Sequence, residues 1–190
     1  MNDIKISNLY DLDKTIAKDI FEGVEYPWEV LSKIKEYILT LGETLSLEEY
    51  DHPQEDVWIS KTAKVFPSAY IGGPCIIDHE AEVRHCAFIR GSAIVGKKCV
   101  VGNSVELKNV ILFDNVQVPH YNYVGDSILG YKSHMGAGSI TSNVKGDKTL
   151  VSIKSDEEEI KTGIKKVGAF LGDYVEVGCN SVLCPGSVIG

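Results

Sequence analysis

The sequence predicts a parallel β-helix, a solenoid of short strands wound around one axis, and two periodic features indicate it. Apolar residues recur at every sixth position without interruption: Ile59, Val65, Ile71, Ile77, Val83, Ile89, Val95, Val101, Leu107 and Phe113. Four positions after each stands a small or aliphatic residue: Ala63, Ala69, Cys75, Ala81, Ala87, Ala93, Cys99, Val105 and Ile111. A period of six fits neither an α-helix nor an alternating strand, and it is typical of hexapeptide solenoids.

Each six-residue unit is expected to form one flat face of a three-sided prism, with the apolar residue inside and the small residue at the corner. Three faces close one coil, so residues eighteen apart should stack at the usual strand spacing of about 4.8 Å. Cys75 and Cys99 occupy small-residue positions, and packing explains them.

Residues 1–50 follow a different pattern and are predicted to be a small helical appendage. Leu9, Leu12, Ile16, Ile20 and Phe21 recur at helical spacing between Ser7 and Gly23, and a second helix is predicted from Pro27 to Gly42. Residues 51–56 are predicted to be a linker, and residues 57–190 to be the solenoid domain.

The regular six-residue spacing of the apolar residues, or beat, changes after Phe113. The next interior candidates are Val118, Val124, Leu129 and Met135, so two steps contain five residues. Residues 144–166 are polar and charged, and they are predicted to be a loop insertion that projects from the coil. The beat returns with Leu171, Val177, Leu183 and Ile189 and stops in mid-array at Gly190, so we expect the native chain to continue.

Composition limits the possible functions. A net charge of -8 argues against general nucleic-acid binding, which needs a basic surface. Five scattered cysteines do not form a disulfide framework, and neither a signal peptide nor an apolar run of membrane-spanning length is present. These features predict a cytoplasmic protein without membrane contact.

Three residues are the first candidates for chemistry. Arg90 and Lys108 are eighteen residues apart and should stack on one face. Neither position offers a carboxylate to compensate the two charges, which favours an anion such as phosphate between them. His120 follows where the beat changes, and histidine is the usual general base near neutral pH.

A metal site is not expected. His79 and His85 are six residues apart, which places them on adjacent faces, and no third histidine has a matching spacing.

Four segments resemble one family of enzymes: Val105-Glu-Leu-Lys-Asn109, His120-Tyr-Asn-Tyr-Val-Gly-Asp126, Met135-Gly-Ala-Gly-Ser-Ile-Thr-Ser-Asn143 and Leu171-Gly-Asp173. They are similar to the acetyltransferase domain of the bifunctional sugar-1-phosphate nucleotidylyltransferase/acetyltransferases, which belong to the hexapeptide-repeat acyltransferases. The resemblance covers about residues 57–190. It implies a left-handed β-helix and a homotrimer with sites between subunits.

The resemblance also assigns roles. It implies that His120 deprotonates the amine of an amino-sugar 1-phosphate, which then attacks acetyl-CoA. Arg90, Lys108 and Tyr123 match the family's acceptor-binding residues, and Asn122 and His134 are further acceptor candidates; His134 replaces the family's asparagine. The cofactor candidates are Gly136, Ala137, Asn143 and Cys179, the last of which replaces a serine. Amides near Gly136 and Ala137 are candidates for stabilising the oxyanion.

The sequence therefore predicts an acetyl-CoA-dependent N-acetyltransferase that acts on glucosamine- or galactosamine-1-phosphate in nucleotide-sugar biosynthesis. Nucleotidylyltransferase activity is not expected, because no Gly-rich phosphate loop is present. The alternative is a non-catalytic scaffold or regulatory subunit that binds a sugar nucleotide.

Overall fold

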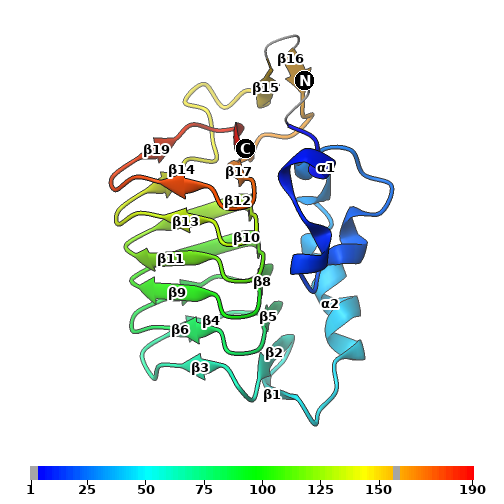
Figure 1. Ribbon diagram of the computed structural model, residues 1–190, viewed down its shortest axis with the longest axis vertical. Coiled ribbons are helices and arrows are strands. Elements are labelled where there is room, and N and C mark those ends of the chain that lie inside the picture. The colour runs from blue at the N-terminus through cyan, green and yellow to red at the C-terminus, as the bar shows by residue number, and fades with distance from the viewer. Residues whose placement is uncertain (1–3, 156–158) are drawn as a thin grey trace.

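A computed structural model describes residues 4–155 and 159–190, and these residues form a left-handed parallel β-helix with a helical module along one side (Figure 1). Its first face contains β2(Val57–Ser60), β5(Cys75–Ile77), β8(Ala93–Val95), the ends of β10(Glu106–Leu112) and β12(Tyr123–Leu129), β17(Ala169–Leu171) and β20(Ser187–Ile189). The second contains β3(Lys64–Val65), β6(Glu82–Val83), β9(Val100–Asn103), β11(Gln117–His120), β13(His134–Met135) and β18(Glu176–Val177). The third contains β4(Tyr70–Ile71), β7(Phe88–Ile89), the starts of β10 and β12, β14(Ile140–Thr141) and β19(Val182–Leu183).

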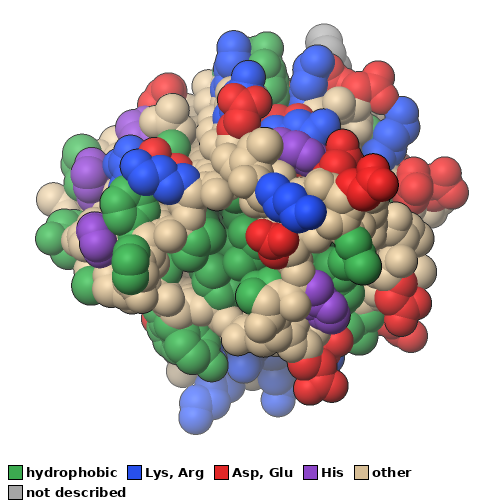
Figure 2. Space-filling model, turned by 90° about the horizontal axis from the view of Figure 1, so that it is seen from below, with side chains coloured by type: hydrophobic (Ala, Val, Ile, Leu, Met, Phe, Trp, Pro, Cys, Tyr) green, Lys and Arg blue, Asp and Glu red, His purple; other side chains and the backbone are tan. Residues whose placement is uncertain are grey.

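The strand register confirms the predicted stacking in the early coils. Lys64 pairs with Glu82 and Glu82 with Val100, each eighteen residues apart. The interior column is fully buried from Ile77 to Leu171. Its apolar residues are partly exposed in the last coil, at Leu183 and Ile189, and in the first coil, at Ile59, Val65 and Ile71. In a view from below, hydrophobic side chains are visible at the centre of that end of the coil (Figure 2).

The first change of beat lies one unit earlier than predicted. Leu112, not Phe113, continues the interior column, because it pairs with Val95. The five-residue steps therefore run from Leu107 to Leu112 and from Val124 to Leu129. Removing one residue at these corners lets β10 and β12 run as single strands across two faces.

Phe113 is buried at a corner and joins the solenoid to the helical module. Its ring centroid lies 5.1 Å from that of Tyr10 and 5.8 Å from that of Phe21. The module and the coil share one hydrophobic core, and the module covers the first face at β5, β8 and β10. The residues predicted to be an appendage are thus packed along the solenoid.

The predicted helix over residues 7–23 is wrong. The segment forms only α1(Ile6–Leu9), followed by the 3₁₀ turns η1(Leu12–Lys14) and η2(Lys18–Phe21). Side chains of Asp11 and Thr15 accept hydrogen bonds from the backbone two residues on, which competes with helical hydrogen bonding. The second helix begins later than predicted, since η3(Pro27–Val30) precedes α2(Ile34–Thr44).

Two segments predicted to be irregular contain strands. Within the expected linker, β1(Tyr50–Gln54) pairs antiparallel with β2. Within the expected loop over 144–166, β15(Ser152–Lys154) and β16(Glu159–Lys161) pair antiparallel. After this insertion the coil resumes as predicted, with Leu171 opposite Leu129 and Val177 opposite Met135.

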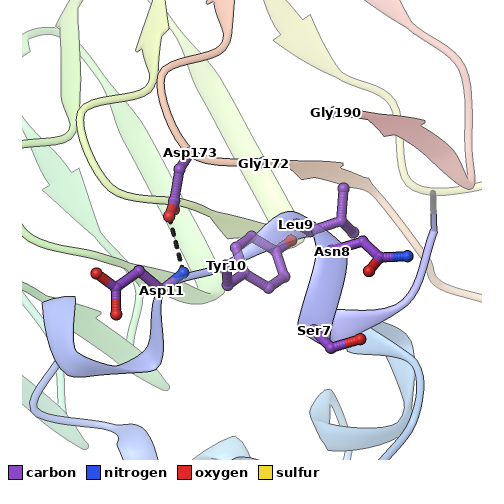
Figure 3. A pocket seen from close by; sticks show the side chains of 8 residues that line it. All are labelled: Ser7, Asn8, Leu9, Tyr10, Asp11, Gly172, Asp173 and Gly190. Carbon is purple, nitrogen blue, oxygen red and sulfur yellow. Dashed lines mark hydrogen bonds between the residues drawn. The ribbon is translucent and has the colours of Figure 1, made fainter.

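The start of the helical module is fastened to a late coil by Asp173 (Figure 3). One carboxylate oxygen accepts from the Asp11 amide at 2.7 Å, and the other accepts from the Tyr131 amide at 2.7 Å. The Asp173 amide donates to the Leu9 carbonyl at 2.9 Å. These bonds border a cavity of about 300 Å³ that also reaches Gly190. In the described part of the chain, no helix is both long and apolar enough to cross a membrane.

Candidate functional site

His120 is exposed at the end of β11, at the corner between the second and third faces. Its carbonyl accepts a hydrogen bond from the Gly138 amide at 3.0 Å. The predicted base therefore lies one coil from the segment Gly136–Gly138 that the sequence assigns to the cofactor. In the preceding coil Asn103 lies opposite His120.

Asn122 holds this corner together from inside. It is 2% exposed, and its amide nitrogen donates to the carbonyls of Gly136 at 2.8 Å and Ser139 at 3.2 Å. Its oxygen accepts from the His120 amide at 3.2 Å. Because Asn122 is buried, it is better placed to position His120 than to contact the acceptor, which is the role that the sequence suggests.

Arg90 and Lys108 lie at neighbouring positions on adjacent coils, since Ile89 pairs with Leu107. Each has a carboxylate partner: Arg90 binds Glu106 at 2.9 Å, and Lys108 binds Asp126 at 2.8 Å. The two stacked positions alone do not reveal these carboxylates in the sequence. The two cations are therefore already compensated within the chain.

Asp126 is a site residue that the sequence reasoning missed. It is 3% exposed, and it accepts hydrogen bonds from Lys108, from Asn109 at 2.9 Å and from Asn143 at 2.6 Å. Asn109 also donates to the Leu31 carbonyl at 3.1 Å, which links this corner to the helical module. Asn109, Asp126 and Asn143 are spaced by seventeen residues. A coil shortened by one five-residue step would have revealed the stack.

Tyr123 lies between the two corners, at the start of the third face of its coil. Its hydroxyl accepts from the Asn143 amide at 3.2 Å. Burial, followed by the nearby charges of Asp126 and Glu106, raises the pKa of Tyr123, so its hydroxyl stays protonated at neutral pH. Tyr123 can therefore donate a hydrogen bond to a ligand.

The cofactor candidates after β13 are packed closely. A side chain at Gly136 would lie 2.6 Å from the Cys179 nitrogen, so only glycine fits. The Gly136 amide donates to the Val177 carbonyl at 2.7 Å, which is a ladder bond and removes this amide from the predicted oxyanion role. The Ala137 carbonyl accepts from the Asn180 amide at 2.8 Å, and Cys179 is exposed.

His134 lies apart from these groups, at the start of β13 rather than at the corner after it. Its Nδ1 lies 2.7 Å from a carboxylate oxygen of Glu176. Both residues border a cavity of about 320 Å³ with Lys132 on the second face.

The candidates thus form two groups on opposite corners of the third face. His120, Asn122 and Gly136–Gly138 gather at one corner, and Lys108 and Asn143 gather around Asp126 at the other. His79 and His85 have separate partners, Asp78 at 2.6 Å and Ser68 at 2.9 Å. Over residues 4–155 and 159–190, no three side chains that could bind a metal come together.

Known proteins similar to this chain include bifunctional enzymes. The bifunctional protein GlmU of Methanococcus maripaludis is 33% identical over 175 residues, which cover 91% of this chain and 42% of that protein. The bifunctional sugar-1-phosphate nucleotidylyltransferase/acetyltransferase of Sulfurisphaera tokodaii is 29% identical over 190 residues, covering 96% of this chain and 47% of that protein. The chain spans less than half the length of these relatives.

Among solved structures, PerB from Caulobacter crescentus, crystallised with CoA and GDP-perosamine, has a TM-score of 0.47 and 18% identity, covering 70% of this chain and 54% of PerB.

The relatives confirm the resemblance found in the sequence motifs and extend it, because a match over 96% of the chain includes most of the helical module. The model of one protein family, described as the GMPPB C-terminal domain, matches residues 71–190. The chain therefore belongs to the GMPPB C-terminal domain family.

Proposed function

We propose that this protein is an acetyl-CoA-dependent N-acetyltransferase that acts on an amino-sugar 1-phosphate, either glucosamine- or galactosamine-1-phosphate, in nucleotide-sugar biosynthesis. The observation that carries the proposal is the corner of His120. His120 is exposed, its backbone carbonyl accepts a hydrogen bond from the glycine-rich segment, and the buried Asn122 binds the backbone of both. The names of the bifunctional relatives support the same reaction class.

The proposed reaction needs one base and no redox partner. The amine nitrogen attacks the thioester carbonyl of acetyl-CoA, and His120 takes the proton that the nitrogen loses. The tetrahedral intermediate then collapses, the carbon–sulfur bond breaks, and His120 returns the proton to the leaving thiolate. The products are an N-acetylated sugar phosphate and free coenzyme A.

Arg90 and Lys108 are the proposed ligands of the acceptor phosphate. Both cations are paired, and the paired Arg90 remains about half exposed. A phosphate that approaches them must share or displace Glu106, whereas Asp126 is buried and stays in place. Arg90 is therefore the cation freer to turn toward the substrate.

The two groups of candidates lie on opposite corners of one face, so a single chain does not bring His120 next to Lys108. A homotrimer would allow one subunit to supply the base and its neighbour the phosphate ligands. We propose this arrangement, which the resemblance to the acetyltransferase domain also implies.

The test is the release of free thiol from acetyl-CoA in the presence of each sugar phosphate. His120→Ala should reduce turnover by at least about a hundredfold, because general-base catalysis contributes roughly 10²–10⁴-fold. His85→Ala is the matched control, because His85 occupies the same corner position two coils before His120. Asn103 lies opposite His120 in the intervening coil, and its side chain donates a hydrogen bond to the carbonyl of His85. The control should retain wild-type turnover. Equal activity in wild type and His120→Ala would refute the role of His120.

A binding scaffold is the second candidate, and the ion pairs favour it. Arg90–Glu106 and Lys108–Asp126 are already neutral pairs, as in a protein that does not process an anion. A scaffold that binds a sugar nucleotide should melt at a higher temperature with UDP-N-acetylglucosamine and release no thiol from acetyl-CoA. Turnover with either sugar phosphate would exclude this candidate.

A further inference from the structure

Three polar residues stack at one corner of successive coils, and the middle residue is a buried carboxylate. The two oxygens of Asp126 have different partners. Oδ1 accepts from Lys108 at 2.8 Å and Asn109 at 2.9 Å, and Oδ2 accepts from the amide nitrogen of Asn143 at 2.6 Å. With 3% of its surface exposed, Asp126 is occupied by these partners and not by a ligand.

This arrangement fixes the orientation of the Asn143 amide. A carboxylate can only accept hydrogen bonds, so Asn143 must turn its NH₂ group toward Asp126. The same NH₂ group donates to the Tyr123 hydroxyl at 3.2 Å. The amide oxygen of Asn143 accepts no hydrogen bond from any residue in 4–155 or 159–190, and the residue is only partly buried. Asn143 therefore offers an acceptor to a ligand.

We propose that Asp126 is a positioning residue that sets Asn143 as a hydrogen-bond acceptor for an amide N–H of the acetyl-CoA arm. The inference rests on the proposed function, because it takes acetyl-CoA to be the ligand at Asn143. It adds a specific polarity to that contact and a residue that controls it.

The substitution Asp126→Asn tests the polarity with little change in shape. Position 126 has φ +49°, a conformation that asparagine also tolerates. The new amide oxygen can still accept from Lys108 and Asn109, but an NH₂ group replaces Oδ2. Two NH₂ groups then face each other, and Asn143 is expected to flip. Its donor, instead of its acceptor, would face the N–H of the ligand.

The reversed pair provides a rescue. Asn143→Asp alone places two carboxylates about 2.6 Å apart and should lower the melting temperature. In the double variant Asp126→Asn/Asn143→Asp, the amide at 126 donates to the carboxylate at 143. That carboxylate keeps one oxygen directed at the ligand, so both the pairing and the acceptor are restored.

The experiment measures acetyl-CoA affinity by calorimetry and melting temperature for the wild type and these three variants. We expect Asp126→Asn to weaken acetyl-CoA binding at least about tenfold, which is the loss of one good hydrogen bond. The double variant should bind within about threefold of wild type and melt above Asn143→Asp. Asn109→Gly, which keeps the backbone at φ +55° and leaves Oδ2 untouched, is the control and should bind acetyl-CoA like wild type.

Wild-type affinity in Asp126→Asn, or no recovery of affinity in the double variant, would overturn the proposal. A wild type that does not bind acetyl-CoA would contradict both the proposed function and acetyl-CoA as the ligand of Asn143. The melting temperatures still decide the pairing in that case. Recovery in the double variant supports a fixed amide at 143, and a double variant that melts no higher than Asn143→Asp refutes it.

Discussion

The corner of His120 depends on one buried side chain, and replacing Asn122 by Ala is the sharpest test of its packing. The variant loses hydrogen bonds to Gly136 and Ser139 and the bond accepted from His120. At about 1 kcal/mol for each of these three bonds, the free energy of unfolding should fall by about 3 kcal/mol. For a chain of this length the melting temperature should fall by about 6–12 °C.

The assay is thermal unfolding followed by circular dichroism. Asn122→Asp should be at least as unstable as Asn122→Ala, because a carboxylate would face the carbonyls of Gly136 and Ser139 without donating. Gln117→Ala, an exposed position on β11, the strand that ends at His120, is the control and should melt within about 1 °C of wild type. A melting temperature for Asn122→Ala within about 2 °C of wild type would refute the tethering role.

Three further predictions concern the core and its ionisable groups. Phe113→Ala should lower the free energy of unfolding, measured in urea, by about 3–5 kcal/mol, because the substitution removes the ring that contacts Tyr10 in the helical module. Phe88→Ala, on the exposed third face, is the control and should lower it by less than half as much. Burial is the largest cause that raises the pKa of Asp114 above its ordinary 3.8, and the charge of Asp78 also raises it. The folded state therefore favours the protonated carboxyl, and the free energy of unfolding falls as the pH rises above about 3.8. Asp114→Asn should therefore raise the melting temperature at pH 7 and lose this advantage near pH 3; an equal gain at both pH values would contradict the assignment. Native protein should expose three reactive thiols to Ellman's reagent and unfolded protein five, because Cys75 and Cys99 are buried. Burial also raises the pKa of Cys75 to about 12. Reaction of all five thiols in the native protein would contradict the packing.

The solenoid could be predicted because its signal is repeated. Each apolar residue from Ile59 to Leu107 repeats the same requirement for a small, dry interior, so local ambiguity averages out. The five-residue step near Leu112 could not be located, because Leu112 and Phe113 are both apolar and both buried. Only the register with Val95 and the contact with Tyr10 distinguish them.

The helical module was less predictable. Helical spacing from Leu9 to Phe21 reflects a face that packs on the solenoid, but the backbone reaches it through short turns. Polar side chains at Asp11 and Thr15 satisfy the backbone locally, and tertiary packing supplies the rest.

The candidate site was predicted in part. Stacking brought Arg90 next to Lys108 from numbering alone, and the change of beat drew attention to His120. Glu106 was missed because it lies two residues before the stacked position, and Asp126, eighteen residues after Lys108, was missed because only the positions of the two cations were compared. A seventeen-residue coil would have placed Asp126 between its two asparagines.

The most direct test of the proposed acetyl transfer is thiol release from acetyl-CoA by this chain with glucosamine-1-phosphate and galactosamine-1-phosphate, with the product identified by mass spectrometry. We expect equal amounts of free thiol and of a sugar phosphate that carries one acetyl group on nitrogen. A folded protein that releases no thiol with either acceptor would contradict it.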